Sequence, residues 1–256
     1  MVINRVIFLF SFIFVLNIDA FANTIKDLKE AIDVAGKQRM LTQRFVKDYV
    51  MIGMKVTYKD PLSDLKKSMQ SFDDAIKSLE EFNKDKNILE SLKSVKTKFN
   101  EIKSILEATP SEDKLKDLSS KCDTLLKQSN DIVTMLSKQK NSEINNIINI
   151  SGRQRMLSQK LASLYFIKAW GIKDIEFKNK LNKNIKLFKD SLDKLSSYKK
   201  NSPKINSLLS EVKSQFRFFE VMSRSNSRFI PSLIYKKSDD ILKDMDKITK
   251  LYTKLQ

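Results

Sequence analysis

A ten-residue block that could bind an anion occurs twice in this chain. Residues 35–44, AGKQRMLTQR, return at residues 151–160 as SGRQRMLSQK, an offset of 116 residues with six identical positions. Each copy holds an arginine, Arg39 or Arg155, among short polar side chains. The planar guanidinium group can bind a carboxylate or a small oxyanion through two parallel hydrogen bonds. The block therefore predicts a small anionic ligand, with further neutral hydrogen bonds from Gln38, Thr42, Gln43, Gln154, Ser158 and Gln159.

Helical spacing puts each arginine in the middle of a semi-buried helix face. In the first copy, Ala35 precedes Arg39 and Thr42 follows it at spacings of four and three, which leaves space beside the guanidinium. Gly36 and Gly152 lie next to this face and allow another backbone to approach closely. A second face of the first copy is apolar and is expected to point into a bundle core. Its residues are Val34, Leu41, Phe45 and Ile52.

The same arrangement has a purely structural explanation. An arginine on an inward face is costly unless it is paired. Arg39 and Arg155 could therefore pair with acidic side chains across a bundle, or extend their charged ends to solvent. Two guanidinium groups without acidic partners would favour ligand binding, whereas two ion pairs would favour the structural role. The residues alone leave this choice open.

The composition excludes several kinds of site. The chain has no His, which rules out His-based zinc sites and Ser-His-Asp or Cys-His catalysis. The single Cys122 has no partner for an internal disulfide, and its helical, partly apolar position favours a small buried residue over a reactive thiol. The repeated block has no clustered carboxylates, and the chain has no Gly-rich phosphate loop. We therefore expect no catalytic residues, no metal and no cofactor, and a protein that is not an enzyme.

The N-terminal segment predicts export. Arg5 precedes an apolar run over residues 6–16, and Ala-Phe-Ala at 20–22 is a small-x-small cleavage site. We expect a signal peptide over residues 1–22 and a periplasmic mature protein, with an uncleaved inner-membrane anchor as the alternative. The net charge of +17 would suggest nucleic acid in a cytosolic protein. Export argues against nucleic acid, and a solvated Lys-rich surface is the simpler interpretation.

The remaining sequence predicts an all-α protein built from two tandem repeats, residues 23–139 and 140–256. Only four Gly and four Pro occur, and apolar residues recur at helical spacing. The second repeat matches the first at the same offset, as Phe72 matches Phe188. Short connections make neighbouring helices antiparallel, which is typical of a four-helix bundle. The expected helices cover residues 24–58, 61–83, 87–108, 111–139, 140–171, 174–200, 203–226 and 232–255.

The junction between the repeats predicts a long shared helix. From Ser111 to Trp170 there is no Pro, and the only Gly is Gly152. Sixty helical residues would span about 90 Å and stack the two bundles end to end. The alternative is a break near Gln139 to Ser142, which the sequence leaves open.

The repeated block, Gly-[Lys/Arg]-Gln-Arg-Met-Leu-[Ser/Thr]-Gln, resembles the signature of the PilJ-type periplasmic domain. That domain is the N-terminal sensor of type IV pilus methyl-accepting chemotaxis transducers and is related to the sensor domain of nitrate/nitrite sensor kinases. The resemblance implies helical bundles in the periplasm. In the nitrate sensors, an arginine directly before the Met binds the anion at a dimer interface, and Arg39 and Arg155 correspond to it. The order Gln-Arg-Met-Leu departs from the nitrate sensors' Arg-Met-Gln, so the resemblance does not identify nitrate.

Two functional hypotheses follow. The first is a non-catalytic, sensor-type module that recognises a small anion or carboxylate through an arginine of each repeat. Having no signalling domain of its own, it would present itself to a membrane receptor, and the resemblance makes a homodimer plausible. The second is a structural or interaction protein of the cell envelope or pilus system that docks a partner through its helix faces. Neither hypothesis involves nucleic acid.

Overall fold

The computed structural model describes residues 24–140, 142–224 and 230–255, and these residues form eight α-helices and no strand. The all-α class predicted from the sequence is confirmed. The proposed signal peptide lies outside the described residues. The first repeat forms α1 (Leu28–Gly53), α2 (Pro61–Phe82), α3 (Lys86–Leu106) and α4 (Glu112–Gln139). The second repeat forms α5 (Glu143–Ala169), α6 (Phe177–Ser196), α7 (Pro203–Arg224) and α8 (Pro231–Thr253).

Side-chain caps explain where several of these helices begin. The Asp27 carboxylate accepts a hydrogen bond from the Glu30 amide at 2.9 Å, and the Asp60 carboxylate accepts one from the Ser63 amide at 3.0 Å. Such a cap satisfies a backbone N–H that has no partner within the first turn. Pro61 follows the second cap, where its missing N–H costs nothing.

The predicted end-to-end stack on a shared helix is wrong, because the chain reverses between the repeats. The last helix of the first repeat ends at Gln139, and the backbone is extended at Lys140 and Ser142. The Ser142 hydroxyl then accepts a hydrogen bond from the Asn145 amide, and the Asn145 side chain donates to the Lys140 carbonyl at 2.7 Å. The absence of Gly and Pro did not prevent the break, since a serine cap and an asparagine side chain supply the missing partners.

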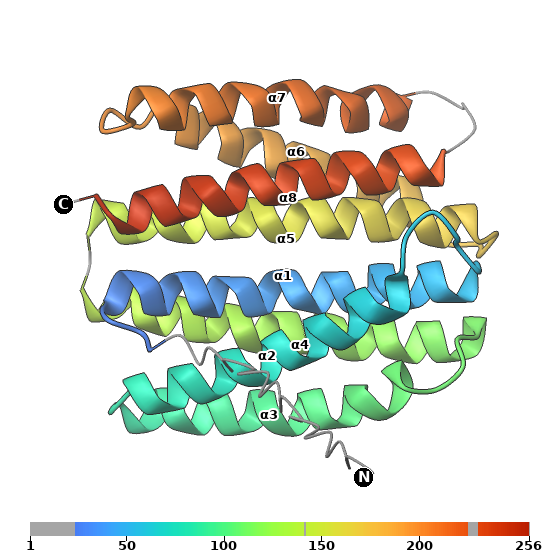
Figure 1. Ribbon diagram of the computed structural model, residues 1–256, viewed down its shortest axis with the longest axis horizontal. Coiled ribbons are helices and arrows are strands. Elements are labelled where there is room, and N and C mark those ends of the chain that lie inside the picture. Colours follow the sequence, from blue (N-terminus) through green and yellow to red (C-terminus); the bar gives the residue numbers. More distant parts are fainter. Residues whose placement is uncertain (1–23, 141, 225–229, 256) are drawn as a thin grey trace, which may run out of the picture.

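The two bundles lie side by side, with α1 and α5 in contact at the centre of the molecule (Figure 1). The helices α2, α3 and α4 cover one side of this central pair, and α6, α7 and α8 cover the other. Both central helices begin at the same end of the molecule, so they run parallel. We call the contact between α1 and α5 the seam; it is the most extensive contact between any two helices.

The two repeats meet at equivalent positions along the seam. A Cβ atom placed on Gly36 would lie 3.8 Å from the Cα atom of Gly152, and a Cβ on Gly152 would lie 3.7 Å from the Cα of Gly36. Pairing of equivalent residues on parallel helices relates the two bundles by an approximate two-fold axis along the seam. Glycine permits this distance because it has no side chain.

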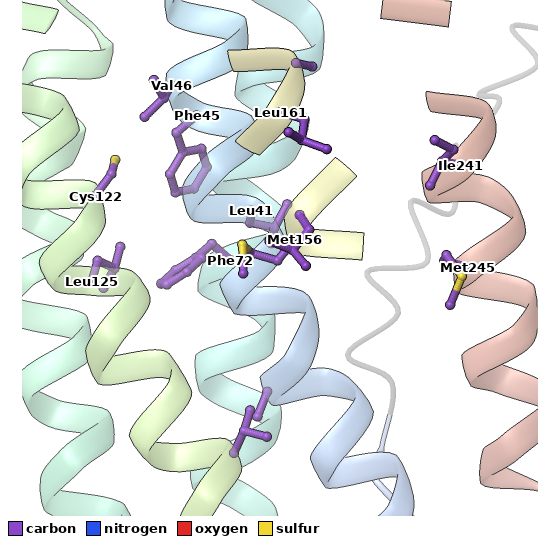
Figure 2. Close-up of a cluster of buried hydrophobic side chains, with 14 of the residues drawn as sticks. Leu41, Phe45, Val46, Phe72, Cys122, Leu125, Met156, Leu161, Ile241 and Met245 are labelled. Atoms are coloured by element: carbon purple, nitrogen blue, oxygen red, sulfur yellow. The ribbon is translucent and has the colours of Figure 1, made fainter. Parts of the chain in front are cut away.

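Each bundle has its own aromatic core away from the seam. In the first bundle, Phe72 lies 4.4 Å from Phe99 and 5.7 Å from Phe45 between ring centroids. Figure 2 shows Phe45 and Leu41 of α1 beside Phe72 of α2, with Cys122 on α4. Cys122 is fully buried, as its spacing predicted, and burial raises the pKa of its thiol.

A valine at Gly152 is expected to separate the central helices. The new side chain would extend past a Cβ that already lies 3.1 Å from the Arg39 Nη2 atom, so we expect Gly152→Val to lower the free energy of unfolding by about 1–3 kcal/mol. Asn146→Val, at an exposed position of the same helix, measures the effect of valine in a helix alone and should change stability by less than about 0.5 kcal/mol. Urea denaturation compares the two, and equal losses would contradict a close seam.

Candidate functional site

Arg39 leaves its own helix and crosses the seam. Its side chain is 1% exposed. Nη1 donates to the side-chain oxygens of Asn149 on α5 at 2.8 Å and of Asn130 on α4 at 3.0 Å, and Nη2 donates to the Asn149 carbonyl at 3.1 Å. Helical side chains lean toward the N-terminus of their helix, which is why Arg39 reaches a residue earlier in the parallel helix. Among the described residues, it makes no ion pair with a carboxylate.

Arg155 makes the matching crossing in the opposite direction. It is fully buried, and its Nη1 atom donates to Asp246 on α8 at 2.8 Å. Its Nη2 atom lies 2.6 Å from a carboxylate oxygen of Asp33 on α1 and donates to the Asp33 carbonyl at 3.2 Å. The contact with the Asp33 carboxylate is an ion pair rather than an aligned hydrogen bond. Two carboxylates therefore surround this guanidinium.

The partners of the two arginines occupy equivalent positions. The offset of 116 residues relates Asp33 to Asn149 and Asn130 to Asp246. Each arginine thus contacts one residue of its own bundle and one across the seam, in a two-fold arrangement. The difference is chemical, because both partners of Arg155 are carboxylates and both partners of Arg39 are amides.

This difference changes the electrostatics of the two guanidinium groups. Burial, together with the nearby cations Arg153 and Arg155, lowers the pKa of Arg39 to about 9, so it is still protonated at neutral pH. Burial also acts to lower the pKa of Arg155, but Asp33 and Asp246 outweigh it and the net shift is upward. Burial acts to raise the pKa of Asp246, and Arg155 and Lys250 more than offset this, so its pKa is lowered. One arginine is therefore compensated and the other is not.

The predicted polar neighbours of the arginines make their hydrogen bonds elsewhere. The Thr42 and Ser158 hydroxyls donate at 2.8 Å to the carbonyls of Arg39 and Arg155, three residues earlier on the same helix. These bonds hold the hydroxyls against their own backbone.

The hydrogen bonds of the glutamines also go to groups other than the guanidiniums. The side chains of Gln43 and Gln159 donate to the hydroxyls of the preceding residues, and Gln159 also donates to the Ser238 carbonyl. Gln154 donates to the Phe188 carbonyl at 2.9 Å, toward the core of its bundle. The Gln38 amide is buried and makes no hydrogen bond within the part of the chain that the structure describes. Of the residues predicted from the repeated block, the structure brings together at the seam the two arginines and the two glycines.

The four residues that decide whether each arginine has a counter-ion were not predicted from the sequence. Asp33, Asn149, Asn130 and Asp246 lie outside the repeated block. A usable signal was present, because the offset pairs an aspartate with an asparagine at both positions. To use this signal, one would have needed to know that these positions face the seam.

A second buried polar cluster, also missed, joins the first bundle to α8. Lys47 is fully buried, and its Nζ atom lies 3.1 Å from Asp239 and 4.6 Å from the centre of the Tyr235 ring. The Tyr235 hydroxyl donates to Asp64 of α2 at 3.1 Å. The second repeat has Ser163 in place of Lys47, so the cluster exists on one side of the two-fold axis.

Asp48 of the same cluster is a buried carboxylate whose cationic partners are distant. It is fully buried, and its oxygens lie 3.5 Å from Arg44 Nε and 3.9 Å from Lys47 Nζ, which is too far for hydrogen bonds. Burial raises the pKa of Asp48 to about 6 despite these two cations. The offset places Leu164 at this position in the second repeat, so a charge here is not required by the fold.

The described residues offer little sign of other chemistry. They contain no group of three or more side chains able to hold a metal ion. A groove of about 560 Å³ between α1, α2 and α8 is lined by charges of both signs, including Asp246, Asp239 and Arg44. In the same described part of the chain, no helix is both long and apolar enough to span a membrane.

A family model described as the N-terminal domain of type IV pili methyl-accepting chemotaxis transducers, PilJ, matches residues 21–126 and 135–225. Two matched segments agree with two tandem copies, as the repeated block predicted. This family is sensory and non-catalytic, and its domains are typically periplasmic. No curated protein and no solved structure matches the chain.

Removal of each arginine is expected to have unequal effects on stability. Arg155→Met leaves Asp33 and Asp246 without their buried cation. It should cost about 3 kcal/mol, near the low end for a broken buried pair, because Asp246 is partly exposed and Lys37 and Lys250 still face the two carboxylates. Arg39→Met leaves only neutral amides and removes an uncompensated charge, so its cost should be much smaller. Chemical denaturation of both variants measures the difference, and equal losses would contradict the assigned partners.

Asp48 is expected to make stability depend on pH near neutrality. Its pKa is raised in the folded state, from 3.8 to about 6, so its contribution is fully present below about pH 4 and is lost as the pH rises through 6. Asp48→Asn stays neutral, so its stability relative to the unmodified protein should increase by about 3 kcal/mol between pH 4 and pH 8. Exposed Asp131→Asn is the control. A pH-independent difference for Asp48→Asn would refute the raised pKa.

Proposed function

The chain belongs to the PilJ-type family of sensory domains, and from that premise we propose that it is an exported, non-catalytic binding module that recognises a small oxyanion at the seam. Arg39 is the recognition residue. The residue types described at the seam are guanidinium groups, carboxylates, amides and glycine, and these fit anion recognition better than catalysis.

The observation that carries the proposal is the uncompensated charge of Arg39. A buried guanidinium without a counter-ion is costly. Here the strongest electrostatic influences on it from other residues come from two further cations, Arg153 and Arg155. An anion at Arg39 would supply the missing negative charge, in a place where water screens the interaction poorly.

The geometry indicates how an anion would bind. Nη1 and Nη2 of Arg39 now donate to oxygens of Asn149 and Asn130, whose side chains are only half-buried. A small oxyanion would displace the amide oxygens from Nη1 and accept the stronger, charge-assisted hydrogen bonds. Binding would thus rearrange two asparagines and would not need a preformed cavity.

The place of the seam in the fold supports a sensory role. In the nitrate sensors that this family resembles, the arginine binds its anion at a dimer interface. The seam takes that place within one chain, because α1 and α5 are parallel and equivalent. A ligand that changes the charge between the two bundles would change their contact, which a membrane receptor could then detect.

A screen of thermal stability tests the proposal. Nitrate, nitrite, sulfate, phosphate and acetate are compared at constant ionic strength. A ligand at about 100 times its Kd should stabilise the protein by about 2.7 kcal/mol. The shift should disappear in Arg39→Met and persist in Arg217→Met, which removes the same charge from an exposed position on α7. No selective shift with any anion would exclude this function and favour an interaction protein.

A further inference from the structure

We infer that the chain carries its own anion at one half of the seam: the carboxylates of Asp33 and Asp246 fill the Arg155 site, while Asn130 and Asn149 keep the Arg39 site open. The chain would then take a single small planar oxyanion, a carboxylate being the closest chemical match. This inference rests on the proposed function and adds that only one of the two equivalent arginines is available to the ligand.

The two halves of the seam can be compared directly, because equivalent positions hold aspartate in one half and asparagine in the other. Asparagine and aspartate have nearly the same shape, so the two sites differ in charge and hardly in volume. At one pair of equivalent positions the geometry is nearly the same, because Nη1 of Arg39 donates to Asn130 at 3.0 Å and Nη1 of Arg155 donates to Asp246 at 2.8 Å. The same cradle thus exists twice, once with carboxylates and once with amides.

The Arg155 site has no unmet need for an anion. Besides the guanidinium, Lys37 lies 3.6 Å from the Asp33 carboxylate and Lys250 lies 2.9 Å from the Asp246 carboxylate. Two carboxylates therefore face one buried and two partly exposed cations. An external anion would have to displace a carboxylate that is covalently tied to the site and already paired, so it would compete poorly.

The Arg39 site lacks these negative charges. The offset places Arg153 where the other half has Lys37, and it places Asn149 where the other half has Asp33. The cation beside the site has been kept while its carboxylate partner is absent. Arg39 and Arg153 therefore leave a local excess of positive charge that an incoming carboxylate would neutralise.

Both asparagines are needed for this openness. Asn130 belongs to the same bundle as Arg39 and Asn149 belongs to the other bundle, so a carboxylate at either position would close the site from one side. We therefore assign Asn130 and Asn149 as the residues that determine which arginine is available. They act by leaving Arg39 without an internal counter-ion.

Reciprocal exchange of the four partners tests the inference on the full chain. In Asn130→Asp/Asn149→Asp, the Arg39 site receives the carboxylates of the other half. We expect a higher melting temperature without ligand and an affinity for acetate or nitrate that is about 30-fold weaker or worse, measured by calorimetric titration. Asn100→Asp/Asn182→Asp, at exposed positions on α3 and α6, adds the same charge and should leave both quantities unchanged.

The opposite exchange opens the second site. Asp33→Asn/Asp246→Asn should bind about two acetate or nitrate ions per chain where the unmodified protein binds about one, and adding Arg155→Met should remove the second. If this variant does not fold, the Asn→Asp exchange still decides. Unchanged affinity and an unchanged or lower melting temperature in that exchange would overturn the inference.

The two proposals can fail separately. If the unmodified protein binds none of the five anions of the thermal screen, the proposed function fails. The melting temperature of Asn130→Asp/Asn149→Asp then tests by itself whether carboxylates at these positions act as an internal counter-ion. A raised melting temperature would show that Arg39 lacks the counter-ion that Arg155 has, and no rise would reject the asymmetry.

Discussion

The rest of the structure depends on the close contact of two parallel helices that each bury an arginine. Gly36 and Gly152 bring α1 and α5 together, and the Nη2 atoms of both arginines lie within 3.5 Å of the position that a Cβ on either glycine would take. Neither guanidinium can reach bulk water from there, so each must find oxygen atoms across the seam. This requirement sets the register of the two helices and hence the placement of the two bundles.

Because the arginine is duplicated, the two repeats can bond their buried guanidinium groups to different partners. Arg155 meets carboxylates and acts as a buried ion-pair centre, while Arg39 meets amides and keeps its charge uncompensated. The first arrangement holds the bundles together. The second leaves a buried guanidinium beside amides and two further cations at the same depth. The two halves of the chain thus differ in how the charge of the buried arginine is neutralised.

Much of the fold and part of the candidate site could be predicted from the sequence. The all-α class, the tandem copies and the family follow from helical periodicity and the repeated block. The end-to-end stack was wrong because a scarcity of Gly and Pro does not exclude a break capped by Ser142. Gln38 and Gln154 were expected beside the arginines that follow them, but adjacent residues on a helix point in different directions, and Gln154 bonds to α6 instead.

The sequence by itself determined what depends on short-range geometry: which residues share a helix face, and that Arg39 and Arg155 occupy equivalent inward positions. Only the tertiary structure decided that the bundles lie side by side and that the arginines cross between them. The partners of Arg39 and Arg155 lie 91 to 122 residues away in the chain. No periodicity reports on such pairs, since they exist only once two complete bundles have packed together. Tertiary packing therefore also decided that a carboxylate or an amide at these positions changes the charge around each arginine.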